Sequence, residues 1–406
     1  MYHQAARSLD LVPVLVTAFP SGGSSVASSE RLQVSGMDVA AVLSAIDRIG
    51  RGRIAGVFAS ASARAELAAR VASALDRPHG DPDAISLCND KHCLRAFLER
   101  KGLNTVEYRH VTTVSDARQA ASQLGGVVVV KPLSSSGSDG VRICQTSEEV
   151  ASHAKRLLKR QLDGMLIEKY IDAPQYSVEV FDGKPLGVKK SYFAGGPFPY
   201  LTGSDLPAPL ESQCLTELEG YACSVVKEVG LLSGPAFVEL RYSGAEKFVI
   251  ELNPRLSLYS PINIYVATDI NVADICIKFS CGIHYDMDSL FKGRKNRACA
   301  GRFVARDGSS VRAIKGGDEA RKVAGVKSVE IDDSQFYRRG PGTSALDRIV
   351  AIHSEADTIE EAAACAELAL KKLTIIYDRF PMNFLKYYYR KMSRLLKKLS
   401  LHKRAQ

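Results

Sequence analysis

The stretch Gly126-Val-Val-Val-Val-Lys131-Pro-Leu-Ser-Ser-Ser-Gly137-Ser-Asp-Gly140-Val141 joins an apolar run to a loop of small residues. Consecutive β-branched residues are typical of a strand that is buried on both faces. Lys131 ends this run, where a charge inside an apolar core would need a partner. Apolar residues then begin a second strand at 141–143. We therefore predict two strands joined by a loop, although a plain surface hairpin with a flexible loop would give the same pattern.

The small residues of this loop predict an anion site. Glycine permits backbone angles at which successive N–H groups converge on one anion. Because a strand follows the loop, and not a helix, this is not the Walker type of phosphate loop. The residues predicted to surround a phosphate are Lys131, Ser136, Gly137, Ser138 and Gly140.

Two later strands, expected at 236–242 and 247–253, predict a metal clamp. The short turn at 243–245 would place Glu239 opposite Glu251, and Asn253 would share their face. Facing carboxylates repel unless a cation lies between them. Oxygen ligands suit Mg²⁺, with Mn²⁺ as an alternative, and Arg255 just beyond could grip a phosphate or carboxylate. The competing interpretation, two glutamates on an exposed hairpin, fits poorly with their apolar neighbours.

These motifs, in this order, resemble the ATP-grasp superfamily, and most closely its carboxylate–amine ligases of the L-amino-acid ligase type. The similarity covers residues 85–283, with a weaker match at 347–371. It implies an ATP-grasp fold of mixed α/β and α+β class, in which two α+β lobes grip ATP. The expected parts are a small parallel α/β domain at 1–84, apparently without its first strand, the ATP-grasp domain at 85–285, a small α+β domain at 286–378 and a basic tail at 379–406.

The resemblance also implies nucleotide contacts between the two motifs. Lys91, in an Asp-Lys pair that opens a predicted helix, would contact a phosphate, unless it is an ordinary solvated lysine. Glu168, Tyr170 and Ile171 would hold the adenine at the hinge between the lobes. Gln175 stands where relatives place a ribose-binding glutamate, so it would bind the hydroxyls without charge assistance.

The implied reaction is an ATP-dependent ligation. A substrate carboxylate would attack the γ-phosphate and give an acyl phosphate. An amine, expected to belong to an amino acid, would then displace phosphate and form an amide. Lys131 and Arg255 would be the catalytic residues, since phosphoryl transfer needs positioning and charge neutralisation. Similar ligases make dipeptides, siderophores and peptide antibiotics. Two alternatives stay open, a bicarbonate-using carboxylase-type enzyme and a non-catalytic ATP-binding protein.

Two departures from the family pattern flank the expected substrate pocket. Phe237 stands where close relatives often carry histidine. The residues after Arg255 are Leu-Ser-Leu-Tyr-Ser, where relatives often have glycines. Since the clamp residues are all present, we interpret these departures as a changed substrate and not as a lost activity.

Composition limits the classes of binding partner and the cellular compartment that can be expected. The formal net charge is +9, and residues 379–406 contain nine Lys or Arg and no Asp or Glu, so the rest of the chain sums to zero. We therefore expect no nucleic-acid partner. Nine scattered cysteines without a CxxC pair indicate free thiols in a reducing compartment, which predicts a cytoplasmic protein. The apolar run at 11–19 is too short to span a bilayer, and Asp10 and Pro13 favour a buried strand over a signal peptide.

The tail predicts a basic amphipathic helix at 384–401. Such a helix could lie on an anionic membrane or an acidic partner, although packing on its own body is the favoured alternative. A homodimer stays open.

Hydrophobic periodicity and turn residues predict the remaining elements. The segment 77–83 is expected to be a linker, and 194–209 a loop that is either a lid or a connection. Helices are expected at 2–9, 38–49, 62–75, 91–101, 115–124, 148–161, 214–229, 267–282 and 358–371, and strands at 11–18, 54–59, 108–112, 165–171, 177–181, 186–192 and 349–353.

Overall fold

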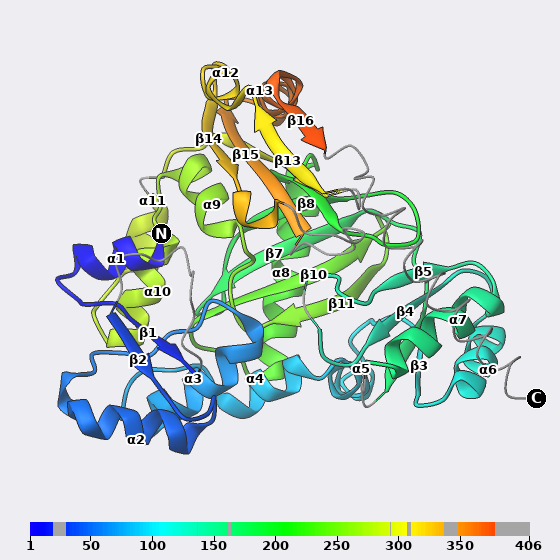
Figure 1. Cartoon of the computed structure of the whole chain (residues 1–406), viewed down its shortest axis with the longest axis horizontal. Helices are drawn as coiled ribbons and strands as arrows, with labels where there is room; N and C mark the ends of the chain where they lie inside the picture. Colours follow the sequence, from blue (N-terminus) through cyan, green and yellow to red (C-terminus); the bar gives the residue numbers. More distant parts are fainter. Residues whose placement is uncertain are drawn as a thin grey trace, which may run out of the picture.

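The computed structural model describes residues 1–18, 30–135, 137–160, 164–292, 294–306, 310–336 and 347–377. An eight-stranded sheet occupies the middle of the molecule (Figure 1). A four-stranded sheet lies on one side of it and the N-terminal elements on the other. The predictions for Ser136 and for the tail at 379–406 fall outside the described residues.

The N-terminal elements form a small α/β unit in which β1 and β2 pair in parallel. Asp38 caps α2, because its side chain accepts a hydrogen bond from the Ala41 amide. The strand predicted at 11–18 is present, but it is not buried, since Val14 is 40% exposed. The elements are α1 (Tyr2–Ser8), β1 (Val14–Thr17), β2 (Glu30–Gln33), α2 (Val39–Ile49), η1 (Arg51–Arg53) and α3 (Ser62–Ala74).

The prediction of a strand at 54–59 is wrong. These residues pair with no strand, although Ile54 and Val57 pack on the N-terminal core. A side chain at Gly56 would collide with the backbone carbonyl of Ser280. The segment is therefore pressed against the end of α10 (Val272–Cys281), and its apolar residues serve packing without a ladder.

The four-stranded sheet carries the glycine and serine loop. Its strand order is β3-β6-β4-β5, all antiparallel, and α6 and α7 pack on it. The predicted linker at 77–83 ends earlier than expected, because Asp81 caps an additional helix with Pro82 at its first position. The elements are α4 (Pro82–Asn89), α5 (Lys91–Arg100), β3 (Tyr108–Val111), α6 (Val114–Leu124), β4 (Val128–Pro132), β5 (Arg142–Cys144), α7 (Ser147–Leu158) and β6 (Met165–Lys169).

The eight-stranded sheet is continuous from the predicted clamp to the C-terminal elements. Its order is β11-β10-β7-β8-β9-β12-β15-β14, and α8 packs on its first strands. The prediction of a loop at 194–209 is wrong in part. The segment contains the strand β9, which pairs with β8 on one side and β12 on the other. The strands of the first half are β7 (Gln175–Phe181), β8 (Lys184–Phe193), β9 (Leu201–Leu206), β10 (Pro235–Tyr242) and β11 (Lys247–Asn253), with α8 at Ser212–Val229.

The single helix predicted at 267–282 is two helices, α9 (Ser260–Thr268) and α10. Asp269 ends α9 in a left-handed conformation, with φ of 62°. Asn271 then caps α10 by accepting a hydrogen bond from the Asp274 amide. The apolar pattern continues across this break, so periodicity alone could not locate it.

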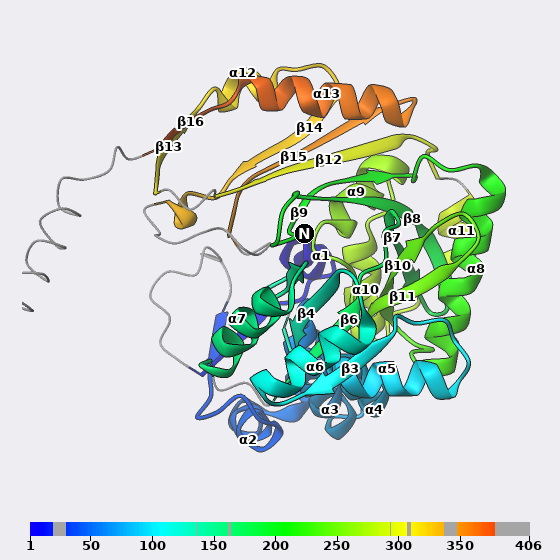
Figure 2. The same cartoon turned by 90° about the vertical axis from the view of Figure 1, so that its right-hand side faces the viewer.

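The C-terminal elements supply the last three strands of the sheet and the two helices that cover them. Figure 2 shows α12 and α13 covering the outer face of β12, β14 and β15. The predicted capping box is confirmed, with reciprocal contacts between Thr358 and Glu361. The elements are α11 (Met287–Lys292), β12 (Ala298–Ala305), β13 (Val311–Lys315), α12 (Gly317–Arg321), β14 (Val326–Ile331), η2 (Asp333–Gln335), β15 (Arg348–Ala356), α13 (Ile359–Lys372) and β16 (Thr374–Tyr377).

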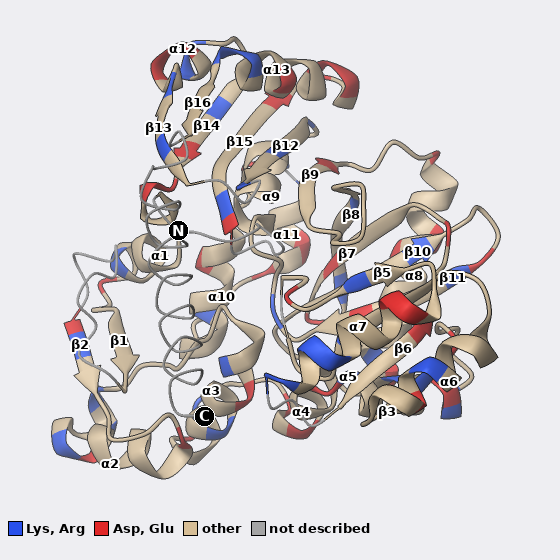
Figure 3. Ribbon diagram, turned by 45° about the vertical axis from the view of Figure 1, so that its right-hand side comes forward, with Lys and Arg blue, Asp and Glu red and all other residues tan. Residues whose placement is uncertain are grey.

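The described surface carries no single dominant charge. Figure 3 shows acidic and basic residues interspersed over both sheets and their helices. All nine cysteines are free thiols, as predicted. No helix in the described parts of the chain is long and apolar enough to cross a membrane.

We predict that Thr358→Ala lowers the free energy of unfolding by about 1 kcal/mol, because it removes the capping box of α13. Thermal or urea unfolding would measure the loss. Thr216→Ala is the matched control, since Thr216 is exposed inside α8 and bonds only the preceding turn. An equal loss in both variants would contradict the capping argument.

Candidate active site

The clamp carboxylates face each other as the sequence predicts. Glu239 on β10 is paired directly with Glu251 on β11, and the register shifts just after Glu239. Ser177 on β7 is the next cross-strand neighbour of Glu239, and Lys189 on β8 is paired with Ser177. Directly opposed residues point to the same face of a sheet. One row across four strands therefore presents two carboxylates, a hydroxyl and an ammonium to the same side.

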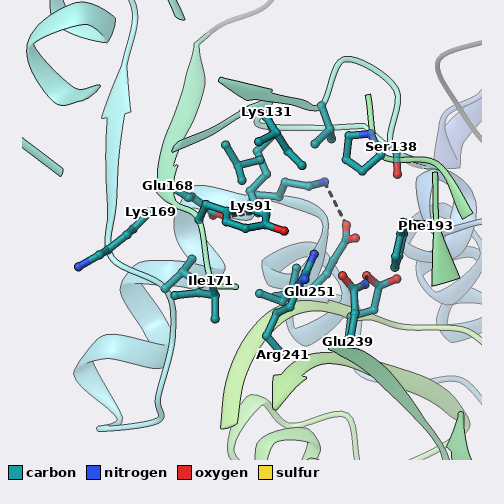
Figure 4. A pocket seen from close by; sticks show the side chains of 18 of the residues that line it. Lys91, Lys131, Ser138, Glu168, Lys169, Ile171, Phe193, Glu239, Arg241 and Glu251 are labelled. Carbon is teal, nitrogen blue, oxygen red and sulfur yellow. Dashed lines mark hydrogen bonds and ion pairs between the residues drawn. The ribbon is translucent and has the colours of Figure 1, made fainter. Parts of the chain in front are cut away.

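A pocket lies between this row and the four-stranded sheet (Figure 4). Both lobes contribute to it: β4, β5 and β6 from one, and β7, β8, β10 and β11 from the other. Its polar lining is Lys91, Lys131, Ser135, Ser138, Glu168, Lys169, Tyr170, Gln175, Glu239, Arg241 and Glu251, and its apolar lining includes Val129, Ile143, Ile171, Phe193 and Ile250.

The loop after β4 has the backbone that its composition predicts. Gly137, Ser138 and Gly140 all have positive φ, between 63° and 77°. Such angles are unusual for serine, so Ser138 marks a constrained turn. Gly137 and Ser138 line the pocket. Gly140 lies behind them, where its carbonyl contacts His153 Nε2 at 2.8 Å.

Lys131 is buried at the end of β4 and has a carboxylate partner. Its Nζ lies 2.7 Å from Glu168 Oε2, and the other oxygen of Glu168 accepts from Arg95 Nε at 2.9 Å. Burial lowers the pKa of Lys131 to about 8, although Glu168 opposes this shift. Burial would raise the pKa of Glu168, but Arg95 and Lys131 outweigh it and lower that pKa. The charge that Lys131 presents to the pocket therefore depends on Glu168.

The Glu168 side chain contacts a cation at each of its two oxygens, so it is the buried counter-ion of Lys131 and Arg95. Its contact with adenine stays a prediction. Tyr170 and Ile171 do line the pocket, and the Tyr170 amide donates to the Val127 carbonyl. Adenine contacts at these two residues stay a prediction.

Lys91 joins the loop to the clamp. Its Nζ donates to the Ser135 carbonyl at 2.9 Å and lies 3.0 Å from Glu251 Oε1, as the dashed line in Figure 4 shows. Lys91 is only 8% exposed, so the alternative of an ordinary solvated lysine is wrong. The first residue of α5 thus contacts both sides of the pocket.

The two clamp glutamates sit in unequal electrostatic environments. Burial, and then the charge of Glu251, raise the pKa of Glu239 to about 7. Burial would also raise the pKa of Glu251, but Lys91 and Lys131 outweigh it and lower that pKa. The ionised form of Glu239 is therefore less well compensated than that of Glu251, and a divalent cation would stabilise it.

The donor set of the clamp fits Mg²⁺. That ion typically uses one or two carboxylates together with water and substrate phosphates. In the described parts of the chain, no cluster of three His, Cys, Asp or Glu could hold a metal by itself. Asn253 follows on the same face, where its Oδ1 accepts from Ser62 Oγ at 2.9 Å. Glu239 and Glu251 would thus be the principal protein ligands.

Comparison with known proteins agrees with this geometry. Residues 88–257 match a family model described as an ATP-grasp domain. The similarity to ATP-grasp domains thus covers the part of the chain that lines the pocket. The L-amino acid ligase from Bacillus licheniformis superposes with a TM-score of 0.77 over 93% of this chain and 95% of that one, at 22% identity. This likeness confirms the ATP-grasp fold that the sequence predicted.

Two relatives are similar in sequence. An uncharacterized protein, y4rH, of Sinorhizobium fredii is 29% identical over 93% of this chain and 82% of its own length. The phosphoribosylamine–glycine ligase of Pyrococcus horikoshii is 27% identical, and the match covers 70% of this chain and 69% of the relative.

Sequence reasoning missed two basic residues of this site. Arg95 is 1% exposed, and the spacing of Lys91, Leu94, Arg95 and Leu98 along the buried face of α5 was a signal for it. Arg241 lines the pocket, donates to the Ala173 carbonyl and lies 5.5 Å from the centre of the Tyr170 ring.

The predicted ribose-binding residue is also in the pocket. Gln175 Nε2 donates to Glu239 Oε2 at 2.7 Å. In this structure the amide of Gln175 therefore orients a clamp carboxylate, and its contact with ribose stays a prediction.

We predict that Glu239→Gln stabilises the ligand-free protein at about pH 8, by roughly 1–3 kcal/mol. Because the folded-state pKa of Glu239 is raised from 4.5 to about 7, its favourable contribution is present below 4.5 and is lost as the pH rises through 7. The variant would gain little at about pH 5. Thermal unfolding at both pH values would measure this.

Glu251→Gln is the matched variant with the opposite sign. It removes the carboxylate whose pKa Lys91 lowers, so it should destabilise the protein at about pH 8. Stabilisation by both substitutions would contradict the conclusion that the ionised Glu239 is the less well compensated carboxylate.

Proposed function

We propose that this chain is an ATP-dependent carboxylate–amine ligase that forms an amide through an acyl phosphate, with an amino acid as one substrate. The observation that carries the proposal is the facing pair Glu239 and Glu251 at the floor of a two-lobed pocket. The ATP-grasp family and the two named ligases support it. The free cysteines support the further proposal of a cytoplasmic protein.

The walls of the pocket supply the positive charge that phosphoryl transfer needs. Lys131 ends β4 beside the loop, and Lys91 opens α5 across from it. Both ammonium groups are almost fully buried, so their attraction for phosphate oxygens is little screened by water. These two lysines and the amides of the 135–140 loop would hold the phosphates of ATP.

The clamp carboxylates would hold a divalent cation next to the phosphate site. Glu239, Glu251 and Asn253 would be its protein ligands, and Mg²⁺ bound there would neutralise the charge that develops on the transferred phosphoryl group. Gln175 keeps Glu239 oriented toward this position by its hydrogen bond.

Arg255 would hold the substrate carboxylate and then the acyl phosphate. Its guanidinium lies 5.2 Å from the centre of the Phe237 ring, and Nη1 donates to the Leu256 carbonyl at 2.9 Å. The cation is thus fixed just beyond the clamp. A carboxylate held there would lie beside the clamp and the phosphate site, which would favour its attack on the γ-phosphate.

Phosphate release from MgATP with pools of carboxylates and amines tests the proposal. We expect ADP formation that requires one carboxylate and one amine. Glu251→Ala should reduce it by at least about 100-fold, since it removes half of the carboxylate clamp. Glu246→Ala, in the exposed turn of the same hairpin, is the matched control and should retain full activity.

Other outcomes identify the alternatives. Turnover that needs bicarbonate and no amine would favour a carboxylase-type enzyme. MgATP binding without turnover on any pool would favour a non-catalytic ATP-binding protein, and absence of nucleotide binding would exclude all three.

A further inference from the structure

One hydroxyl of the N-terminal unit touches two residues of the proposed site. Arg255 Nε donates to Ser62 Oγ at 2.7 Å, and Ser62 Oγ donates to Asn253 Oδ1 at 2.9 Å. Ser62 is the first residue of α3 and lies 193 positions before Arg255 in the chain. A segment far away in the sequence therefore completes the end of the clamp.

The direction of this hydrogen-bond chain is fixed by its chemistry. A guanidinium can only donate, and a hydroxyl has a single proton. Ser62 therefore accepts from Arg255. Because the atom of Asn253 beside the hydroxyl is the amide oxygen, Ser62 gives its proton to Asn253. The same contact orients the amide of Asn253 with its oxygen toward the hydroxyl. That oxygen has two lone pairs, so it can accept from Ser62 and still face a metal ion.

The contacts of Arg255 leave one edge of its guanidinium available. Ser62 accepts from Nε, the Leu256 carbonyl accepts from Nη1, and the central carbon of the guanidinium lies over the Phe237 ring. Within the described parts of the chain, no hydrogen bond or ion pair engages Nη2. A guanidinium fixed at three points loses little further freedom when an anion binds to that edge.

The hydroxyl of Ser62 is not used by its own helix. The N-cap of α3 is Ala61, which offers no side-chain cap, and both hydrogen bonds of Ser62 Oγ go to the strand β11 and to Arg255 just beyond it. An ordinary capping role therefore does not account for this side chain.

We propose that Ser62 is a positioning residue that aims Arg255 at an oxyanion and links it to Asn253 of the metal clamp. The inference rests on the proposed function, in which Arg255 holds a carboxylate or phosphate and Asn253 faces the metal. Ser62 acts through these two residues and does not touch the reacting atoms. Its loss would leave the Arg255 Nε–H without an acceptor and Asn253 Oδ1 without its donor.

Binding of inorganic phosphate to the full chain saturated with MgADP tests the inference. Titration calorimetry would compare the wild type with Ser62→Ala, Ser62→Thr and Ser147→Ala. Ser147 is the control because it is also the first residue of its helix, α7. We expect Ser62→Ala to weaken phosphate binding by about 10- to 100-fold, the usual range for one hydrogen bond to a charged group.

The affinity for MgADP and the Ser62→Thr variant distinguish a positioning role of Ser62 from a purely structural one. The affinity for MgADP alone should stay within about twofold, and Ser62→Thr, which keeps the hydroxyl, should restore phosphate binding to within about threefold. Wild-type phosphate affinity in Ser62→Ala would overturn the inference. So would a parallel loss of MgADP affinity, phosphate affinity and melting temperature, or an absence of phosphate binding to the wild type.

The experiment distinguishes this inference from the proposed function. Phosphate binding needs no turnover, so a wild type that binds MgADP and phosphate but ligates nothing would contradict only the ligase proposal. Where turnover is found, Ser62→Ala should raise KM for the carboxylate more than KM for ATP, and an equal rise in both would count against positioning.

Discussion

The repulsion between Glu239 and Glu251 is the constraint on which the rest of the site depends. The antiparallel register of β10 and β11 leaves the two carboxylates face to face in a largely buried pocket. Lys91, Lys131 and Arg255 offset this charge, and each comes from a different segment: the start of α5, the end of β4, and the residues after β11. Because the compensating cations belong to both lobes, the charge of the clamp also holds the lobes toward each other.

The cations of the pocket need their own compensation, which a third carboxylate provides. Glu168 is shared by Lys131 and Arg95, and all three residues are at most 5% exposed. The site contains four cations, Lys91, Arg95, Lys131 and Arg255, and three carboxylates, Glu168, Glu239 and Glu251. One positive charge is therefore in excess, before the lining residues Lys169 and Arg241 are counted. A polyanion such as a nucleotide phosphate is therefore favoured, while the buried ion pairs keep the ligand-free pocket from carrying a larger unpaired charge.

Local patterns predicted local features well. The β-branched run gave β4, the short turn after β10 gave the pairing of Glu239 with Glu251, and the Thr-x-x-Glu signature gave the cap of α13. Features set by distant segments could not be predicted. Arg95 meets Glu168 across 73 positions and Ser62 meets Arg255 across 193. The error at 54–59 has the same origin, because an apolar run pressed against α10 has the composition of a strand.

The departures from the family pattern acquire a physical meaning in the fold. Phe237 supplies the aromatic face on which Arg255 lies. The residues after Arg255 are tied to the sheet by side chains, since Lys189 Nζ contacts the hydroxyls of Ser257 and Ser260 and lies 2.8 Å from the buried Glu179. Glycines at these positions could form none of these hydrogen bonds. The wall beside the clamp is therefore shaped by a buried ion pair and two hydroxyls.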